Sequence, residues 1–168
     1  MVFSYRTAFP RVKYFCGYGS YTRGRQQGTG IYRDRPDGKK VSLEDFKGKK
    51  LVLYFYPEDD TPTCTVQACN LRDNHGALLK AGYTVVGVSP NTAADHQKFR
   101  KKFSLPFSLL TDPTHAIINA YGVWGEKNLY GRKYTGLHRT TFVIDEQGVI
   151  EKVFLRPRTK AHAEEILK

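Results

Sequence analysis

The sequence contains few cysteines and no long apolar run. Three cysteines in 168 residues are too few for the disulfide framework that holds small secreted domains together. A membrane-spanning helix needs about 18 consecutive apolar residues, and no stretch of the sequence approaches that length. The first residues also lack the apolar core of a secretory signal. We therefore expect a protein of a reducing compartment, the cytoplasm, with no membrane attachment and with cysteines used for chemistry.

Acidic residues are absent from residues 1–33, which carry six of the 27 lysines and arginines. The rest of the chain holds 21 basic against 16 acidic side chains, so more than half of the net charge of +11 belongs to this first segment. Rich in Tyr, Arg and Gly and without helix or strand periodicity, it predicts a flexible basic extension over residues 1–30. An organellar targeting segment is the alternative.

The remaining residues, 31–168, alternate apolar runs with helical patterns. "LVLYFY" (51–56) and "YTVVGVSP" (83–90) are continuous apolar, β-rich runs, which are typical of strands buried on both faces. A helix predicted between them, over 62–80, makes a strand–helix–strand unit with parallel strands. The patterns that follow predict a helix over 92–104, a strand over 107–112, a helix over 113–122, a loop over 130–139, a hairpin over 139–155 and a helix over 159–168.

This order of elements predicts an α/β domain with a thioredoxin-like fold, in which helices flank a central mixed sheet. The charge balance of this domain is only mildly basic, so no nucleic-acid partner is expected of it.

Cys64 stands where a helix is predicted to begin. In "TPTC", Thr61 suits the N-cap and Pro62 the first helical position, so Cys64 falls in the first turn. The N–H groups of that turn have no intrahelical partner, and the helix dipole is positive at this end. A thiolate is therefore stabilised there, which makes Cys64 a candidate nucleophile.

Cys69 follows five residues later. On an intact α-helix the two Cα atoms are roughly 8.6 Å apart, whereas disulfides need less than about 7 Å. Cys64 and Cys69 can therefore bond only if part of the helix unwinds. Cys69 as a plain core cysteine is the alternative, and Cys16 is interpreted as an incidental thiol. A metal site built from Cys64, Cys69 and His75 is not expected, because the spacing fits no zinc motif and a fourth ligand is missing.

The pattern P-x-x-x-T-x-x-C (Pro57, Thr61, Cys64), the segment "CTVQAC" and the downstream "HRTTFVID" closely resemble a peroxiredoxin. The C-x4-C spacing is similar to that of the bacterioferritin-comigratory-protein subfamily, also called peroxiredoxin Q. The resemblance runs from about Gly38 to the C-terminus. It departs from the family at Thr63, where glycine is usual, and at "GTGIYRDRPDG", which replaces the usual first hairpin.

The resemblance implies a thiol peroxidase that reduces hydrogen peroxide and organic hydroperoxides without a metal or cofactor. It implies that Cys64 attacks the peroxide, that Thr61 holds it, that Pro57 shields the site from water and that Arg139 adds positive charge. Cys69 would be the resolving thiol that condenses with the sulfenic acid of Cys64. Thioredoxin or a similar dithiol would then reduce the intramolecular disulfide, and a monomer or weak homodimer is expected.

Two other readings stay open on the residues alone. The first is a thioredoxin-like binding module whose basic N-terminal arm contacts nucleic acid or an acidic surface, with a steep dependence on salt. The second is a disulfide oxidoreductase, although the usual C-x-x-C exchange motif is absent.

Overall fold

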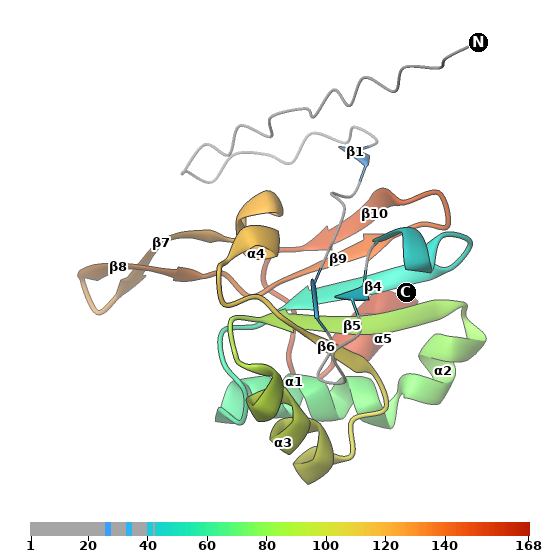
Figure 1. The fold of residues 1–168 in the computed structure, drawn as a ribbon, viewed down its shortest axis with the longest axis horizontal. Coiled ribbons are helices and arrows are strands. Elements are labelled where there is room, and N and C mark those ends of the chain that lie inside the picture. The colour runs from blue at the N-terminus through green and yellow to red at the C-terminus, as the bar shows by residue number, and fades with distance from the viewer. Residues whose placement is uncertain (1–25, 28–32, 35–39, 42) are drawn as a thin grey trace.

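A central sheet organises the chain in the computed structural model, which describes residues 26–27, 33–34, 40–41 and 43–168. In this part the sheet has six strands in the order β1-β10-β9-β4-β5-β6 (Figure 1). The strands are β1 (Gln26–Gln27), β4 (Lys50–Phe55), β5 (Tyr83–Ser89), β6 (Ser108–Thr111), β9 (Thr140–Ile144) and β10 (Val149–Phe154).

The sheet is mixed, as the sequence predicts. β4, β5 and β6 are parallel neighbours, and β9 and β10 run antiparallel to their neighbours. The predicted extension over 1–30 lies outside the described residues, except for β1, which pairs antiparallel with β10 at the edge of the sheet.

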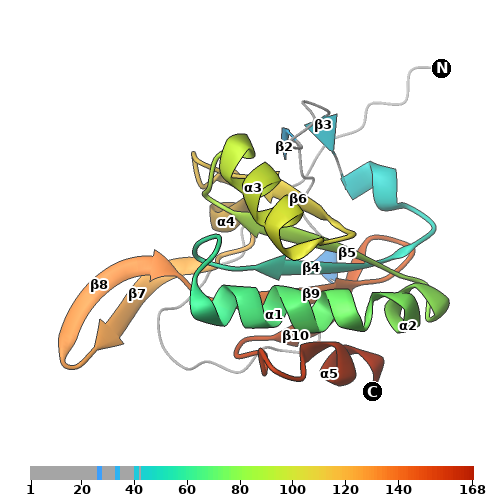
Figure 2. The same ribbon diagram turned by 90° about the horizontal axis from the view of Figure 1, so that it is seen from below.

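Helices cover both faces of the sheet (Figure 2). One face carries α1 (Pro62–Asp73), α2 (His75–Lys80), α3 (Ala93–Phe103) and α5 (His162–Leu167), and the other carries α4 (Ala116–Ala120) with the short 3-10 turn η1 (Leu43–Phe46). Each face of the sheet has its own apolar core, one against α1 and one against α4. Successive side chains of a strand point to opposite faces, so the residues of β4 alternate between these two cores. Tyr54 packs in the α1 core, whereas Leu53 and Phe55 pack against the core of α4.

Three predicted helices are shorter than expected, and the one over 159–168 begins only at His162. The helix over 62–80 breaks at Asn74, whose side-chain amide and backbone N–H both donate to the carbonyl of Asn70, so a side-chain bond competes with the helical ladder. The helix over 113–122 begins only at Ala116, because His115 is left-handed with φ 55°. The Asp112 carboxylate there accepts from the N–H groups of Ala116 and Ile118.

The predicted loop over 130–139 is wrong: most of it belongs to a hairpin of β7 (Trp124–Leu129) and β8 (Arg132–Leu137). Tyr130 and Gly131 both have positive φ, which is the geometry of a tight two-residue hairpin turn. Figures 1 and 2 show the hairpin projecting from the body. Its side chains are largely exposed, so no apolar run marks it in the sequence.

A second small pair of strands, apart from the central sheet, is formed by β2 (Arg33–Asp34) and β3 (Lys40–Val41).

None of the helices in the described ranges combines the length and the apolar character that a membrane crossing requires.

Gly87 of β5 permits a close approach within the α1 core. A Cβ at this position would lie 2.7 Å from Leu109 Cδ2 and 2.8 Å from the hydroxyl of Tyr54, and both side chains are fully buried with no space to retreat. We expect Gly87→Ala to lower the free energy of unfolding by about 1–3 kcal/mol, measured by urea denaturation. Gly76→Ala is the control: nothing lies within 4 Å of its added Cβ, so stability is expected to hold or to rise by about 0.5–1 kcal/mol. Equal effects of the two changes would contradict this account.

Candidate active site

The pairing of β4 with β9 brings two distant segments together. Thr140, the first residue of β9, pairs with Phe55, the last residue of β4. Arg139 therefore lies beside the point where the chain leaves β4 and turns through residues 56–61 into α1. The sheet register thus places an arginine next to the start of a helix more than 70 residues earlier in the chain.

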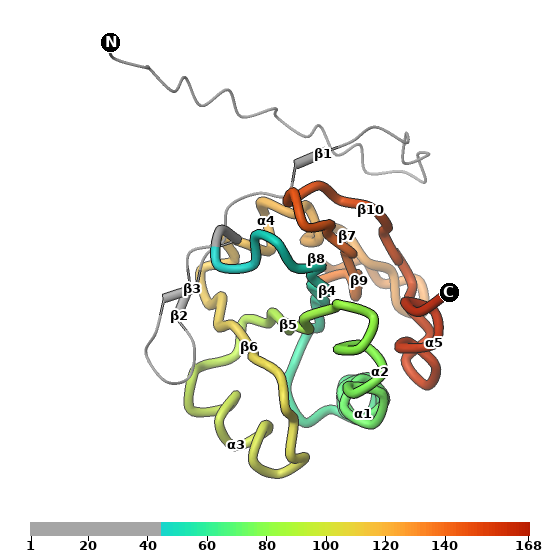
Figure 3. The backbone as a smooth tube through the Cα atoms, turned by 90° about the vertical axis from the view of Figure 1, so that its right-hand side faces the viewer, coloured from blue at the N-terminus to red at the C-terminus, as the bar shows by residue number. Residues whose placement is uncertain are grey.

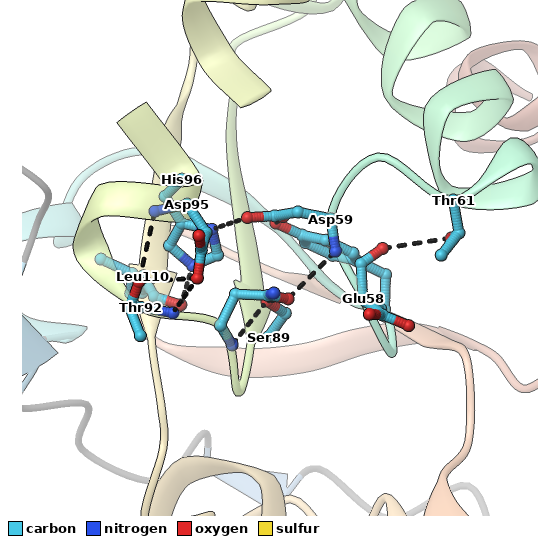
Figure 4. Close-up of polar contacts among 10 residues, drawn as sticks. Glu58, Asp59, Thr61, Ser89, Thr92, Asp95, His96 and Leu110 are labelled. Atoms are coloured by element: carbon cyan, nitrogen blue, oxygen red, sulfur yellow. Dashed lines mark hydrogen bonds and ion pairs between the residues drawn. The ribbon is translucent and has the colours of Figure 1, made fainter. Parts of the chain in front are cut away.

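Cys64 lies in the first turn of α1, as the sequence predicts. Thr61 is the N-cap with extended backbone (φ −79°, ψ 151°), and Pro62 is the first helical residue. The Thr61 side chain does not cap the helix; its hydroxyl donates to the carbonyl of Glu58 at 3.2 Å (Figure 4). Cys64 is only 2% exposed, so its sulfur is largely shielded from solvent and electrostatic effects on it are strong.

The guanidinium of Arg139 contacts the sulfur directly. Its Nη2 donates to Cys64 Sγ at 3.1 Å, and its Nη1 donates to Gln67 Oε1 at 2.6 Å. A fixed positive charge and the positive end of the helix dipole therefore meet at one sulfur atom. This arrangement stabilises a thiolate and any negative charge that develops on an atom leaving it.

Gln67 is a site residue that the sequence reasoning missed. It is fully buried and lies one helical turn after Cys64, so the two side chains share a face of α1. Its amide oxygen orients the guanidinium of Arg139 toward the sulfur. A polar residue three positions after the cysteine, on the buried face of the helix, is the signal that could have identified it.

Tyr54 lies in the same core. Burial raises the pKa of Tyr54 well above its usual value, and the negative charges of Asp59 and Cys64 raise it further. The phenol therefore stays protonated and adds no charge to the site. Its ring stacks on that of Tyr56 with centroids 5.3 Å apart.

Cys69 lies on the same helix, half-buried, and both cysteines are free thiols. The residues that follow Cys69 bind α1 to its neighbours on both sides, α3 and α5 (Figure 3). Asn70 donates to the Lys160 carbonyl at 3.1 Å and accepts from the Ala163 N–H at 2.8 Å. Arg72 donates to the carbonyl of Phe103 at 2.8 Å.

Of the predicted site residues, Cys64 and Arg139 are in contact. Thr61 begins the helix, and Pro57 is half-buried in the loop before it. Cys69 is on the helix but is not bonded to Cys64. Within the described ranges, no group of three His, Cys, Asp or Glu side chains is arranged to hold a metal ion.

The chain matches the model of the AhpC/TSA family over residues 29–153. It is 46% identical over 131 residues to peroxiredoxin Bcp of Escherichia coli (strain K12), covering 78% of this chain and 84% of that protein. It is 43% identical to peroxiredoxin Bcp of Bacillus subtilis (strain 168), covering 78% and 83%. Among solved structures, the bacterioferritin comigratory protein of Xanthomonas campestris is similar, with a TM-score of 0.76, 30% identity and coverage of 82% and 87%.

We expect Arg139→Lys to slow the reaction of Cys64 with hydrogen peroxide about 10²-fold, the usual cost of losing one positioned donor at a developing charge. Lysine keeps the positive charge but lacks the two guanidinium nitrogens that donate to Cys64 and Gln67 at the same time. The second-order rate constant is measured by rapid quenching with an alkylating agent. Arg158→Lys is the control, because that side chain is exposed and pairs with Glu165. A wild-type rate in Arg139→Lys would show that charge alone is sufficient.

Proposed function

Because this chain belongs to the AhpC/TSA family and is a peroxiredoxin, an enzyme that reduces peroxides with a thiol, we propose that it reduces hydrogen peroxide and organic hydroperoxides through Cys64. The observation that carries this assignment is the 3.1 Å contact between Arg139 Nη2 and Cys64 Sγ at the start of α1. It supports Cys64 as the reacting cysteine, because a guanidinium at this distance stabilises negative charge on the sulfur.

The first step is an attack of the Cys64 thiolate on one oxygen of the peroxide. The S–O bond forms as the O–O bond breaks, and the departing oxygen takes a proton to leave as water or an alcohol. Cys64 is oxidised to a sulfenic acid. Arg139 and the free N–H groups of the first helical turn stabilise the negative charge as it moves from sulfur to the departing oxygen.

Thr61 and Pro57 would form the peroxide-binding part of the site. Thr61 is the N-cap of α1, three residues before Cys64, and its hydroxyl is the polar group of the loop nearest in sequence to the sulfur. Pro57 is half-buried at the start of the loop and has no N–H group that would attract water.

The second step joins Cys64 to Cys69. The thiol of Cys69 attacks the sulfenic sulfur, water leaves and a disulfide forms. α1 is continuous from Pro62 to Asp73, so its geometry separates the two Cα atoms by about 8.6 Å, beyond the about 7 Å limit of a disulfide. Part of α1 therefore has to unwind in each catalytic cycle.

The end of α1 that carries Cys64 is the weaker one. Pro62, Thr63 and Val66 are exposed, whereas the half beyond Cys69 is bonded to α5 through Asn70. Oxidation weakens this first turn further, because a neutral sulfenic acid replaces the thiolate that Arg139 holds. We infer that the turn with Cys64 unwinds and moves toward a stationary Cys69.

Thioredoxin or a similar dithiol would supply the two electrons and two protons that restore both thiols. The similar protein of Xanthomonas campestris has alkyl peroxide reduction activity. This activity supports the proposal that organic hydroperoxides are among the substrates of this chain. Four expectations stay predictions: thioredoxin as the reductant, a monomer or weak homodimer, a cytoplasmic location and the absence of a nucleic-acid partner.

Cys64→Ser is expected to abolish peroxide consumption, because a serine hydroxyl is not ionised at neutral pH and cannot accept the oxygen. The measurement is loss of hydrogen peroxide with thioredoxin, its reductase and NADPH. Cys16→Ser serves as the control and should keep wild-type turnover. Residual turnover in Cys64→Ser would require a different peroxidatic thiol.

Cys69→Ser is expected to keep the first reduction of peroxide but to stop turnover with thioredoxin. After one equivalent of peroxide, mass spectrometry of the alkylated protein should show a Cys64–Cys69 disulfide in the wild type. The variant should instead show Cys64 as sulfenic acid, converted to sulfinic acid by more peroxide. Unchanged steady-state turnover in Cys69→Ser would overturn its resolving role and direct attention to Cys16.

A further inference from the structure

A buried acid–histidine pair joins the proposed peroxide-binding loop, residues 56–61, to α3, and neither residue of the pair has so far been given a role. Asp59 belongs to the loop between β4 and α1, and His96 belongs to α3. His96 Nδ1 and Asp59 Oδ2 are 2.7 Å apart, and the two side chains are 0% and 5% exposed (Figure 4). The loop that carries Pro57 and Thr61 is thus tied to a helix more than 30 residues later in the chain.

The side-chain nitrogens and oxygens of this pair all have partners. His96 Nε2 is 3.2 Å from the carbonyl oxygen of Leu110 on β6, and since a carbonyl only accepts, this nitrogen carries a hydrogen. Asp59 Oδ1 accepts from the Tyr56 hydroxyl at 2.7 Å. Burial raises the pKa of Tyr56, so its hydroxyl remains a donor.

The backbone of the loop is held at the same place. The N–H of Asp59 donates to Asn91 Oδ1 at 3.0 Å, and the Ser89 hydroxyl donates to the same oxygen at 2.8 Å. Asp59 therefore connects the loop to α3 through His96 and to the end of β5 through Asn91. Figure 4 shows Asp59 between His96 on one side and the end of β5 at Ser89 on the other.

The next residue explains why such an anchor is needed. Asp60 is left-handed with φ 59°, a conformation that costs a non-glycine residue roughly 1–2 kcal/mol and persists only where its surroundings impose it. The side chain of Asp60 is about half exposed, and its partner among the described residues is the exposed Lys102. Such a surface pair contributes little to stability. The buried contacts of Asp59 are thus the ones placed to impose the turn that leads to Thr61 and Cys64.

We propose that Asp59 and His96 are positioning residues for peroxide reduction: their pair fixes the loop that presents Thr61 and Pro57 to the peroxide bound at Cys64. This assignment rests on the proposed function of that loop. A buried polar pair is weak evidence of stability, but removing one partner leaves the other buried without its hydrogen bond. The pair's contribution is therefore the geometry of the loop, and a misplacement of about 1 Å in such a site can slow a reaction about 10²-fold.

The test compares two reactions of the same sulfur in the full-length reduced protein. Hydrogen peroxide requires the loop, whereas iodoacetamide alkylates Cys64 without it. In Asp59→Ala and in His96→Leu we expect the second-order rate constant with peroxide to fall about 10- to 100-fold, and alkylation to stay within about twofold of wild type. Peroxide rates equal to wild type in both variants would overturn the proposal.

Asp59→Asn is the matched rescue variant. An asparagine amide can donate to His96 Nδ1 while its oxygen still accepts from Tyr56, so both bonds survive without charge, and near-wild-type peroxide rates are expected. A loss in Asp59→Asn as large as in Asp59→Ala would overturn the positioning role, because charge rather than geometry would then matter. If a single variant does not fold, Asp59→Ala/His96→Leu removes both buried groups and is tested in the same way.

Thr92→Ala controls for simple destabilisation of α3. It removes the capping box that Thr92 forms with Asp95 and lowers stability, but it keeps the Thr92 carbonyl that accepts from the His96 N–H and leaves the side chains of Asp59 and His96 unchanged. Its peroxide rate should equal that of wild type, and a fall matching that of His96→Leu would reduce the pair to a structural role. A wild-type protein that leaves peroxide unconsumed would instead refute the proposed function itself, whatever the variants do.

Discussion

The contact between Arg139 and Cys64 is the interaction on which the rest of this structure depends. A thiolate in a nearly closed site needs a compensating charge, and α1 alone offers only the partial charge of its first turn. Arg139 supplies a full charge because β9 pairs with β4 in a register that ends at Phe55 and Thr140. The pairing of β4 with β9 in the central sheet thus brings Arg139 to the sulfur of Cys64.

The same contact links reactivity to motion. While the sulfur is charged, Arg139 binds it and Gln67 holds the guanidinium in place, so the first turn of α1 stays wound. Once the sulfur carries oxygen, this attraction weakens and the turn loses its charged anchor. In the proposed cycle, oxidation then promotes the unwinding that a bond between Cys64 and Cys69 requires, and no separate trigger is needed.

The parts of the fold that the sequence predicted are those with a local pattern. The apolar runs of β4 and β5, and "TPTC" at the start of α1, carry their structure in adjacent residues. The prediction of a loop over 130–139 misses β8 and the hairpin it forms with β7, because these exposed strands bury too little to leave an apolar pattern. The roles of Gln67 and of the pair Asp59–His96 depend on side chains that meet only after folding, at separations of 72 and 37 positions.

These contacts divide the segment around the reactive cysteine into three parts. Before it, Asp59 is bonded to α3 and to the end of β5. After it, Asn70 and Arg72 are bonded to α5 and to the end of α3. Between them, the turn with Cys64 is held by the contact of its sulfur with Arg139, which oxidation of the sulfur weakens. In the proposed cycle, these bonded flanks confine the motion to the turn with Cys64. The loop of Thr61 and the thiol of Cys69 would then both stay in place while the oxidised sulfur moves from one to the other.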